Sequence, residues 1–257
     1  MPEARRHAVD HLEVQVHSDG DALAAVAADE AITVLRRAVE ARGVAHAMFA
    51  TGNSQLAFVR SLASRDGVPW SDVVVFHMDE YVGIGPDHPA GFQRWIRERI
   101  SARVHPREAH YIDGLADPDA ECARYASLLR THPLDLCCLG IGENGHLAFN
   151  DPPVADFEDP LDVKVVELDG ACRRQQVNEG HFPAIGEVPA LAVTVTIPAL
   201  LRAGRVLAIV PEQRKARPVR DALLGPVSTA CPASVLRCHD NVALHLDAGS
   251  AGLLGWG

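Results

Sequence analysis

Short apolar runs alternate with amphipathic stretches along most of the chain. Runs rich in Val, Leu, Ile and Ala predict buried strands at Ala45–Ala50, Val73–His77, Leu134–Ile141, Ala192–Thr196, Val206–Val210 and Val242–Leu246. Helical spacing of apolar positions predicts helices at Asp21–Ala41, Ser54–Ser64, Gly91–Ala102, Asp117–Leu129, Gln213–Leu224 and Ala233–Arg237. This alternation is typical of a Rossmann-like α/β fold, with an open, mostly parallel sheet and helices on both faces in three α/β/α layers. We expect residues 1–257 to form a single domain of this kind.

The predicted strand that ends near residue 141 leads directly into a glycine-spaced polar turn. This turn contains Gly142, Asn144, Gly145, His146 and Asp151. Glycines let the backbone approach a ligand closely, and histidine exchanges protons readily near neutral pH. Because open α/β sheets bind ligands at the carboxyl ends of their strands, the turn is a candidate site of proton transfer. An ordinary tight turn with an exposed histidine explains the same residues equally well.

The strand predicted at residues 73–77 is followed by two adjacent carboxylates, Asp79 and Glu80. A carboxylate at a strand end can take a proton from carbon when its surroundings hold it ionised and oriented. Most Asp-Glu pairs are solvated turn residues. Taken alone, this pair favours the second interpretation.

Small polar residues follow the strand predicted at residues 45–50, namely Thr51, Gly52, Asn53 and Ser54. Amide groups at a helix start, together with hydroxyls, can hold a phosphate, although a plain helix cap is the alternative. Basic residues that could assist occur at Arg173, Arg174 and Lys215. Lys215 begins a predicted helix, where the helix dipole disfavours a cation. A bound phosphate would explain it, and so would a solvated charged helix.

Composition limits the classes of function. The formal net charge of −10 argues against nucleic acid or an anionic membrane surface as partner, and no apolar run is long enough to span a bilayer. The N-terminal segment lacks the apolar run of a signal peptide, and six cysteines without a CxxC pair favour a reduced, cytoplasmic protein. The histidines show no zinc-type spacing, so we expect no metal. His77, His146, Cys172 and His181 could still converge in space.

Taken together, these segments resemble the glucosamine-6-phosphate deaminase family, within the wider group that also contains 6-phosphogluconolactonases. The likeness extends over nearly the whole chain, and its motifs appear in the order of the family. They are Thr-Gly at 51–52, Met-Asp-Glu-Tyr-Val-Gly at 78–83, His-Pro at 88–89, Gly-Ile-Gly-Glu-Asn-Gly-His-Leu-Ala-Phe-Asn at 140–150 and Lys-Ala at 215–216. Such an ordered set is far more specific than any one motif.

The resemblance implies reversible conversion of glucosamine 6-phosphate and water to fructose 6-phosphate and ammonia, without metal or organic cofactor. It implies that His146 assists opening of the sugar ring, that Asp79 moves the proton of the aldose–ketose step, and that Asn144 and Asp151 orient or charge the histidine. The residues implied to hold the phosphate are Thr51, Gly52, Asn53, Ser54, Lys215 and one of Arg173 and Arg174. Those implied to contact the sugar are Glu80, Gly142 and Gly145. A homo-oligomer is left open, because family members range from monomers to hexamers.

Three features depart from the family pattern. Asn144 stands where Asp is common, and Asp151 stands where Glu is usual, which shortens the side chain by about 1.5 Å. The segment Cys172–Glu187 is longer than expected, so a different phosphosugar could fit.

Two other functions compete with deamination. A lactonase typically continues from Gly-His into a stretch like Thr-Ser-Leu-Phe-Pro, whereas residues 147–151 here follow the deaminase pattern. A non-catalytic phosphosugar sensor would need no acid–base groups. The presence of both Asp79 and His146 therefore favours an enzyme.

Overall fold

A mostly parallel sheet of eight strands forms the centre of the protein. The computed structural model describes residues 4–256, and the first three residues of the polar N-terminal segment considered above lie outside the described residues. In spatial order the strands are β1 (Arg5–Val9), β2 (Leu12–His17), β11 (Val242–Asp247), β10 (Arg205–Val210), β7 (Leu136–Leu139), β3 (Ala45–Phe49), β4 (Val73–His77) and β6 (Glu108–His110). Only the β1–β2 pair in this sheet is antiparallel. The predicted mostly parallel sheet is confirmed, with β3, β4, β7, β10 and β11 where the sequence predicts strands, whereas β1, β2 and β6 were not predicted.

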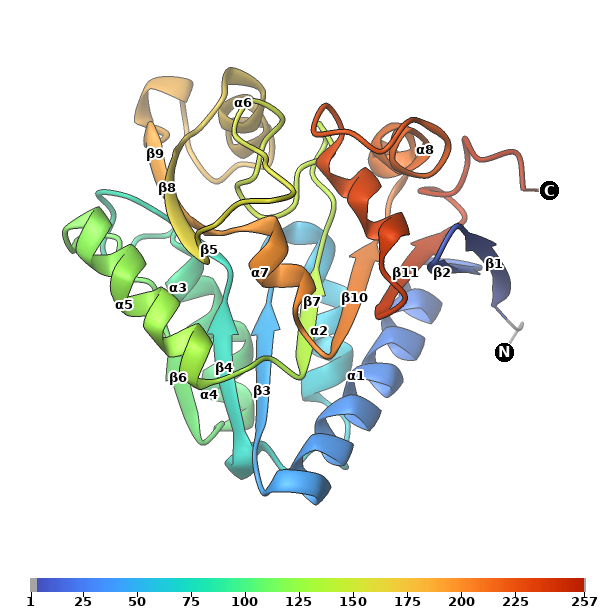
Figure 1. Cartoon of the computed structure of the whole chain (residues 1–257), viewed down its shortest axis with the longest axis horizontal. Coiled ribbons are helices and arrows are strands. Elements are labelled where there is room, and N and C mark those ends of the chain that lie inside the picture. Colours follow the sequence, from blue (N-terminus) through green and yellow to red (C-terminus); the bar gives the residue numbers. More distant parts are fainter. Residues whose placement is uncertain (1–3, 257) are drawn as a thin grey trace.

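Helices cover both faces of this sheet, as predicted (Figure 1). One face carries α1 (Gly20–Arg42), α2 (Leu56–Ala63) and a continuous helical stretch made of α3 (Phe92–Ile96), the π-helical turn η3 (Arg97–Ser101) and α4 (Ala102–Val104). The other face carries α5 (Pro118–Thr131), α7 (Ile197–Leu201), α8 (Ala216–Leu224) and η6 (Pro232–Cys238). The segment predicted as a helix at residues 233–237 is therefore the 3₁₀ helix η6.

Capping residues set the ends of the long helices. The Asp19 carboxylate accepts a hydrogen bond from the amide of Ala22 at 2.8 Å and starts α1, which Gly43 ends at a φ of 73°. Asp117 starts α5 in the same way, as its position before Pro118 predicts. Although α1 has 23 residues, the part of the chain that the structure describes contains no helix both long and apolar enough to cross a membrane.

A second sheet, which the sequence pattern did not predict, lies beside the carboxyl ends of the main strands (Figure 1). It consists of the antiparallel strands β5 (Asp79–Tyr81), β9 (Leu191–Val195) and β8 (Val163–Glu167), in that order. The strand predicted at residues 192–196 is present as β9, but it belongs to this sheet and not to the parallel one. Met78 alone separates β4 from β5, so the chain passes from one sheet to the other just before Asp79.

Candidate active site

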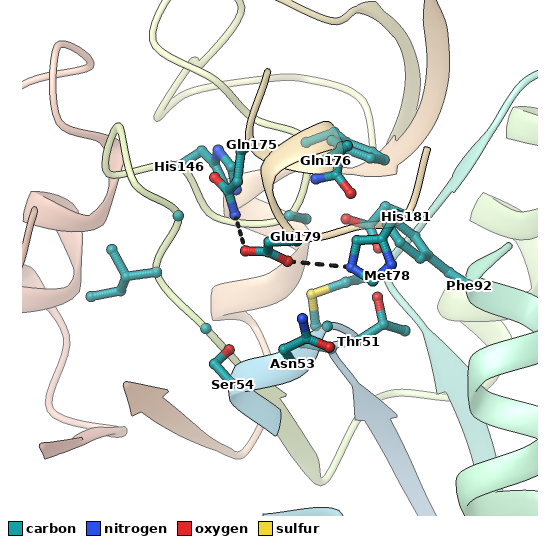
Figure 2. A pocket seen from close by; sticks show the side chains of 18 of the residues that line it. Thr51, Asn53, Ser54, Met78, Phe92, His146, Gln175, Gln176, Glu179 and His181 are labelled. Atoms are coloured by element: carbon teal, nitrogen blue, oxygen red, sulfur yellow. Dashed lines mark hydrogen bonds and ion pairs between the residues drawn. The ribbon is translucent and has the colours of Figure 1, made fainter. Parts of the chain in front are cut away.

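A pocket opens where the carboxyl ends of β3, β4, β7 and β10 meet the second sheet and α6 (Gly170–Asn178) (Figure 2). Its lining consists of Ala50, Thr51, Gly52, Asn53, Ser54, Met78, Asp79, Phe92, Gly140, Ile141, Gly142, His146, Ala148, Phe149, Gln175, Gln176, Glu179, His181 and Lys215. The structure thus brings together the three segments near residues 51, 79 and 146, along with Lys215. It does so because neighbouring parallel strands end at the same edge of the sheet.

His146 belongs to a hydrogen-bonded group inside its own turn. Its Nδ1 lies 2.7 Å from Oδ1 of Asp151, the same oxygen that accepts a hydrogen bond from Nδ2 of Asn144 at 2.8 Å. The backbone amide of His146 donates to Oδ1 of Asn144 at 3.1 Å. Asp151, although shorter than the glutamate usual at this position, therefore contacts the imidazole directly. Asn144 stabilises the pair through hydrogen bonds to both residues.

Asp151 is fully buried behind the imidazole. Burial acts to raise the pKa of Asp151, but the neighbouring His146 and hydrogen bonds from both partners outweigh it, so that the pKa is lowered. An ionised Asp151 keeps the proton of Nδ1 on the ring. Nε2 is then the ring nitrogen left to exchange a proton with a ligand.

The two glycines of the turn have different roles. A Cβ atom at Gly142 would overlap the imidazole of His146, so only glycine lets the ring lie against the turn and leaves Gly142 in the pocket lining. Gly145 is not a lining residue. It adopts a φ of 85°, and a Cβ atom there would lie 2.7 Å from Sγ of Cys231, so its role is to close the turn.

Asp79 lines the pocket from the first position of β5. Its backbone pairs with Thr194 of β9, which fixes the carboxyl group relative to the main sheet. Burial raises the pKa of Asp79 well above its ordinary value, and the charges of Glu80 and Asp151 add to this effect. A carboxyl group with a raised pKa is suited to taking and returning protons near neutral pH.

Glu80, expected to contact the sugar, does not line the pocket and has a structural role, so the sugar contact stays a prediction. Its carboxylate accepts hydrogen bonds from the backbone amides of Tyr81 at 2.9 Å, Phe92 at 3.1 Å and Gln93 at 2.7 Å, and thereby caps α3. Burial raises the pKa of Glu80 to about 7 even though these bonds act to lower it. Because successive side chains of a strand point to opposite sides, Asp79 faces the pocket while Glu80 holds the helix that brings Phe92 to it.

Two βα loops form one end of the pocket. The first runs from Thr51 through η1 (Asn53–Gln55), and the second ends in η5 (Gln213–Lys215). Lys215 is 3% exposed, and burial lowers its pKa. Within residues 4–256 its amino group makes no hydrogen bond or ion pair with another side chain. A buried cation beside amide and hydroxyl groups suits a phosphate.

The two arginines expected at the phosphate do not line the pocket. The guanidinium of Arg173 donates to the backbone carbonyls of Ile185 at 2.7 Å and Val188 at 2.9 Å, which ties down the segment after α6. Arg174 is exposed to solvent. The prediction that one of them binds phosphate therefore lacks support in this structure, because the helix phase turns both side chains away.

Other residues from the α6 region line the pocket and were missed from sequence. Glu179 is the centre of this group: its carboxylate accepts from Gln175 at 3.0 Å and Arg214 at 2.6 Å, and lies 3.3 Å from Nε2 of His181 (Figure 2). Burial opposes ionisation of Glu179, but these partners lower its pKa to about 2. Asp169, which caps α6, is the sequence signal that could have located this helix.

Three of the four residues proposed to converge lie in or beside the pocket. His181 lines it, while a ring nitrogen of His146, a carboxylate oxygen of Asp151 and the sulfur of Cys172 all lie within 4.8 Å of one another. His77 lies apart, with its Nε2 accepting a hydrogen bond from the amide of Ile112 at 2.8 Å. Because His146 and Asp151 already bond to each other, the arrangement of the three atoms is accounted for without a metal ion.

Comparison with known proteins agrees with this geometry. Residues 18–166 match the family model described as glucosamine-6-phosphate isomerases/6-phosphogluconolactonase. A glucosamine-6-phosphate deaminase of Exiguobacterium sibiricum is 36% identical over 208 residues, covering 80% of this chain and 79% of that protein. One of Listeria innocua is 31% identical over 226 residues, with 88% and 94% covered.

Solved structures show the same relationship. A monomeric glucosamine-6-phosphate deaminase superposes with a TM-score of 0.84 at 28% identity, covering 93% of this chain and 99% of that one. A 6-phosphogluconolactonase from Shewanella baltica gives a TM-score of 0.76 at 19% identity, with 94% and 97% covered, which shows the shared fold alone. On the family match and the extent of the sequence identity, this chain belongs to the glucosamine-6-phosphate deaminase family, within the glucosamine-6-phosphate isomerase/6-phosphogluconolactonase superfamily.

Proposed function

We propose that this protein is an aldose–ketose isomerising deaminase that converts glucosamine 6-phosphate, or a close hexosamine phosphate, and water to fructose 6-phosphate and ammonia. The observation that carries this proposal is that Asp79 and His146, from two different strand ends, line one pocket together with Lys215. The reaction needs two acid–base groups and an anchor for phosphate. All three are available within this pocket.

His146 is suited to opening the sugar ring. Opening requires a proton at the ring oxygen and loss of one from the anomeric hydroxyl. With Nδ1 held by Asp151 at 2.7 Å, Nε2 can take the hydroxyl proton and return it to the ring oxygen. Asn144 and Asp151 act in this scheme by orienting the imidazole.

Asp79 is suited to the proton transfer that follows. It would take the proton from C2 of the open-chain aldehyde and return it at C1, which converts the amino aldose into the imine of the ketose. Water then adds to the imine carbon and ammonia leaves. The raised pKa of Asp79 supports such a shuttle, because the same carboxyl group must bind a proton and release it within one turnover.

Replacement of Lys215 is expected to weaken binding more than turnover. Lys215→Ala removes a buried cation, so KM for the phosphosugar should rise about ten- to hundredfold while kcat changes less than about threefold. Steady-state kinetics of ammonia release measure both constants. Arg217→Ala, two residues further on in α8 and with a largely exposed side chain, is the matched control. An unchanged KM in Lys215→Ala would remove Lys215 from the phosphate site.

The reaction class is tested by two parallel assays on the full chain. Glucosamine 6-phosphate and galactosamine 6-phosphate are assayed for ammonia release, and 6-phosphogluconolactone is assayed for ring hydrolysis. We expect ammonia from at least one hexosamine phosphate and no enzymatic lactone opening. Lactone opening without ammonia release would make the protein a lactonase, whereas saturable phosphosugar binding without either reaction would make it a sensor.

Two further properties remain proposals. The six cysteines are free, and four of them are buried, which supports a reducing compartment such as the cytoplasm. The homo-oligomer that the family resemblance leaves open stays a prediction, and a mass measurement in solution tests it.

A further inference from the structure

The two oxygens of the Asp151 carboxylate have different surroundings. Oδ1 faces His146 and Asn144 at 2.7 and 2.8 Å. Oδ2 is buried, and within residues 4–256 no donor, a thiol included, meets it with hydrogen-bond geometry. A buried carboxylate oxygen without a donor is costly. A donor beside Asp151 would therefore stabilise this carboxylate.

The thiol of Cys172 lies beside the Asp151 carboxylate. Cys172 is 1% exposed, and its sulfur lies within 4.8 Å of both a carboxylate oxygen of Asp151 and a ring nitrogen of His146. It is fixed in the first turn of α6, because its amide donates to the capping carboxylate of Asp169 at 2.6 Å. A thiol is a weak hydrogen-bond donor, and here it faces an ionised acceptor, which strengthens the bond.

We propose that Cys172 is a positioning residue for the reaction, whose thiol turns to donate a hydrogen bond to the Asp151 carboxylate and so holds this carboxylate against His146. The proposal rests on the proposed function, since it concerns the same site. Cys172 would be a third group that supports the imidazole, after Asn144 and Asp151. It comes from α6, outside the turn that contains His146.

The thiol acts as a neutral donor and not as a thiolate. Burial raises the pKa of Cys172 well above its ordinary value, and the negative charge of Asp151 is the next largest cause. Asp169 and Asp79 add smaller effects of the same sign. A thiol held in this form is a poor nucleophile and a poor metal ligand, whereas its proton remains available to Asp151.

The position of Cys172 also links the catalytic pair to the pocket wall. Gln175 and Gln176 lie three and four residues further along α6, on the same helix face. A bond between Cys172 and Asp151 therefore fixes the helix that carries these two lining residues. Loss of the bond should disturb proton transfer more than phosphate binding, because Lys215 and Thr51 belong to other segments.

The test compares Cys172→Ala, which has no donor, with Cys172→Ser, which keeps one. We expect Cys172→Ala to lose about three- to tenfold in kcat, with KM changed less than about twofold. Cys172→Ser should retain most of the wild-type kcat. Cys122→Ala, which removes another buried thiol, from α5, should leave both constants unchanged.

The pH profile separates positioning from packing. The groups that face Asp151 and Cys172 are His146, Asn144, Asp79, Asp169 and Tyr81. Without the thiol, the His146–Asp151 pair should bind its proton more tightly, so the acidic limb of kcat/KM moves to higher pH in Cys172→Ala. A wild-type profile in Cys172→Ala would overturn the proposal, even if the variant were less stable.

A second measurement needs no substrate. The imidazole of His146 is followed by NMR through a pH titration of the unliganded protein, with His146→Gln used to assign its signal. We expect the titration to shift to higher pH in Cys172→Ala and to stay near wild type in Cys172→Ser. An unshifted titration in Cys172→Ala would overturn the role of Cys172. Failure of the wild type to release ammonia would count against the proposed function alone.

Discussion

Asp79→Asn is expected to lower kcat by about 10²- to 10⁴-fold while the affinity for the phosphosugar stays within about tenfold. The substitution keeps the size of the side chain but removes the group that accepts a proton from C2. The phosphate contacts proposed at Thr51 and Lys215 remain. Ammonia release measures turnover, and calorimetric titration with the phosphosugar measures affinity.

A solvent-exchange experiment sharpens this prediction. In D₂O the wild type should incorporate deuterium at the position of proton transfer, and Asp79→Asn should not. Asp66→Asn, at an exposed position after α2, is the control for a change of charge alone. Turnover near the wild-type rate in Asp79→Asn would show that another group is the base.

His146→Gln is expected to slow the reaction of the cyclic sugar by about 10²- to 10³-fold. Glutamine can still donate a hydrogen bond toward Asp151, but it cannot exchange a proton at neutral pH. Steady-state ammonia release from the cyclic hexosamine phosphate measures the effect. His11→Gln, at an exposed position between β1 and β2, is the control.

An acyclic ligand separates ring opening from binding. The affinity of His146→Gln for 2-amino-2-deoxyglucitol 6-phosphate should stay within about tenfold of wild type, because this ligand needs no ring opening and uses the same phosphate contacts. A normal rate with the cyclic sugar would exclude the imidazole from ring opening.

Most of the main sheet could be predicted from sequence, but its strands β1, β2 and β6 and the second sheet could not. The strands around residues 45, 73 and 206 are continuous apolar runs, as expected for strands buried on both faces. Strand β5 has only three residues, two of them acidic. The spacing of apolar residues also does not determine which sheet a strand joins. For this reason the strand β9 was predicted without a second sheet.

The site was predicted where chemistry follows a strand end and missed where it lies on a helix. Thr51, Asp79 and His146 meet because parallel strands end together. In the α6 region, Arg173 and Arg174 were predicted to bind phosphate because they are basic. The charge of a side chain does not determine whether it points into the pocket. The helix phase decides instead: Cys172, Gln175, Gln176 and Glu179 are spaced i, i+3, i+4 and i+7, so they share one face.

The antiparallel pairing of β8 with β9 also bears on how members of such a family could diverge. The end of β8 and the start of β9 are paired neighbours. Just beyond them, the amide of Leu168 donates a hydrogen bond to the carbonyl of Ala190 at 2.8 Å. Residues 169–189 therefore form a single excursion from the second sheet. Insertions or deletions after Glu179 would reshape one wall of the pocket while leaving the register of the central strands and the contact of Cys172 with Asp151 unaltered.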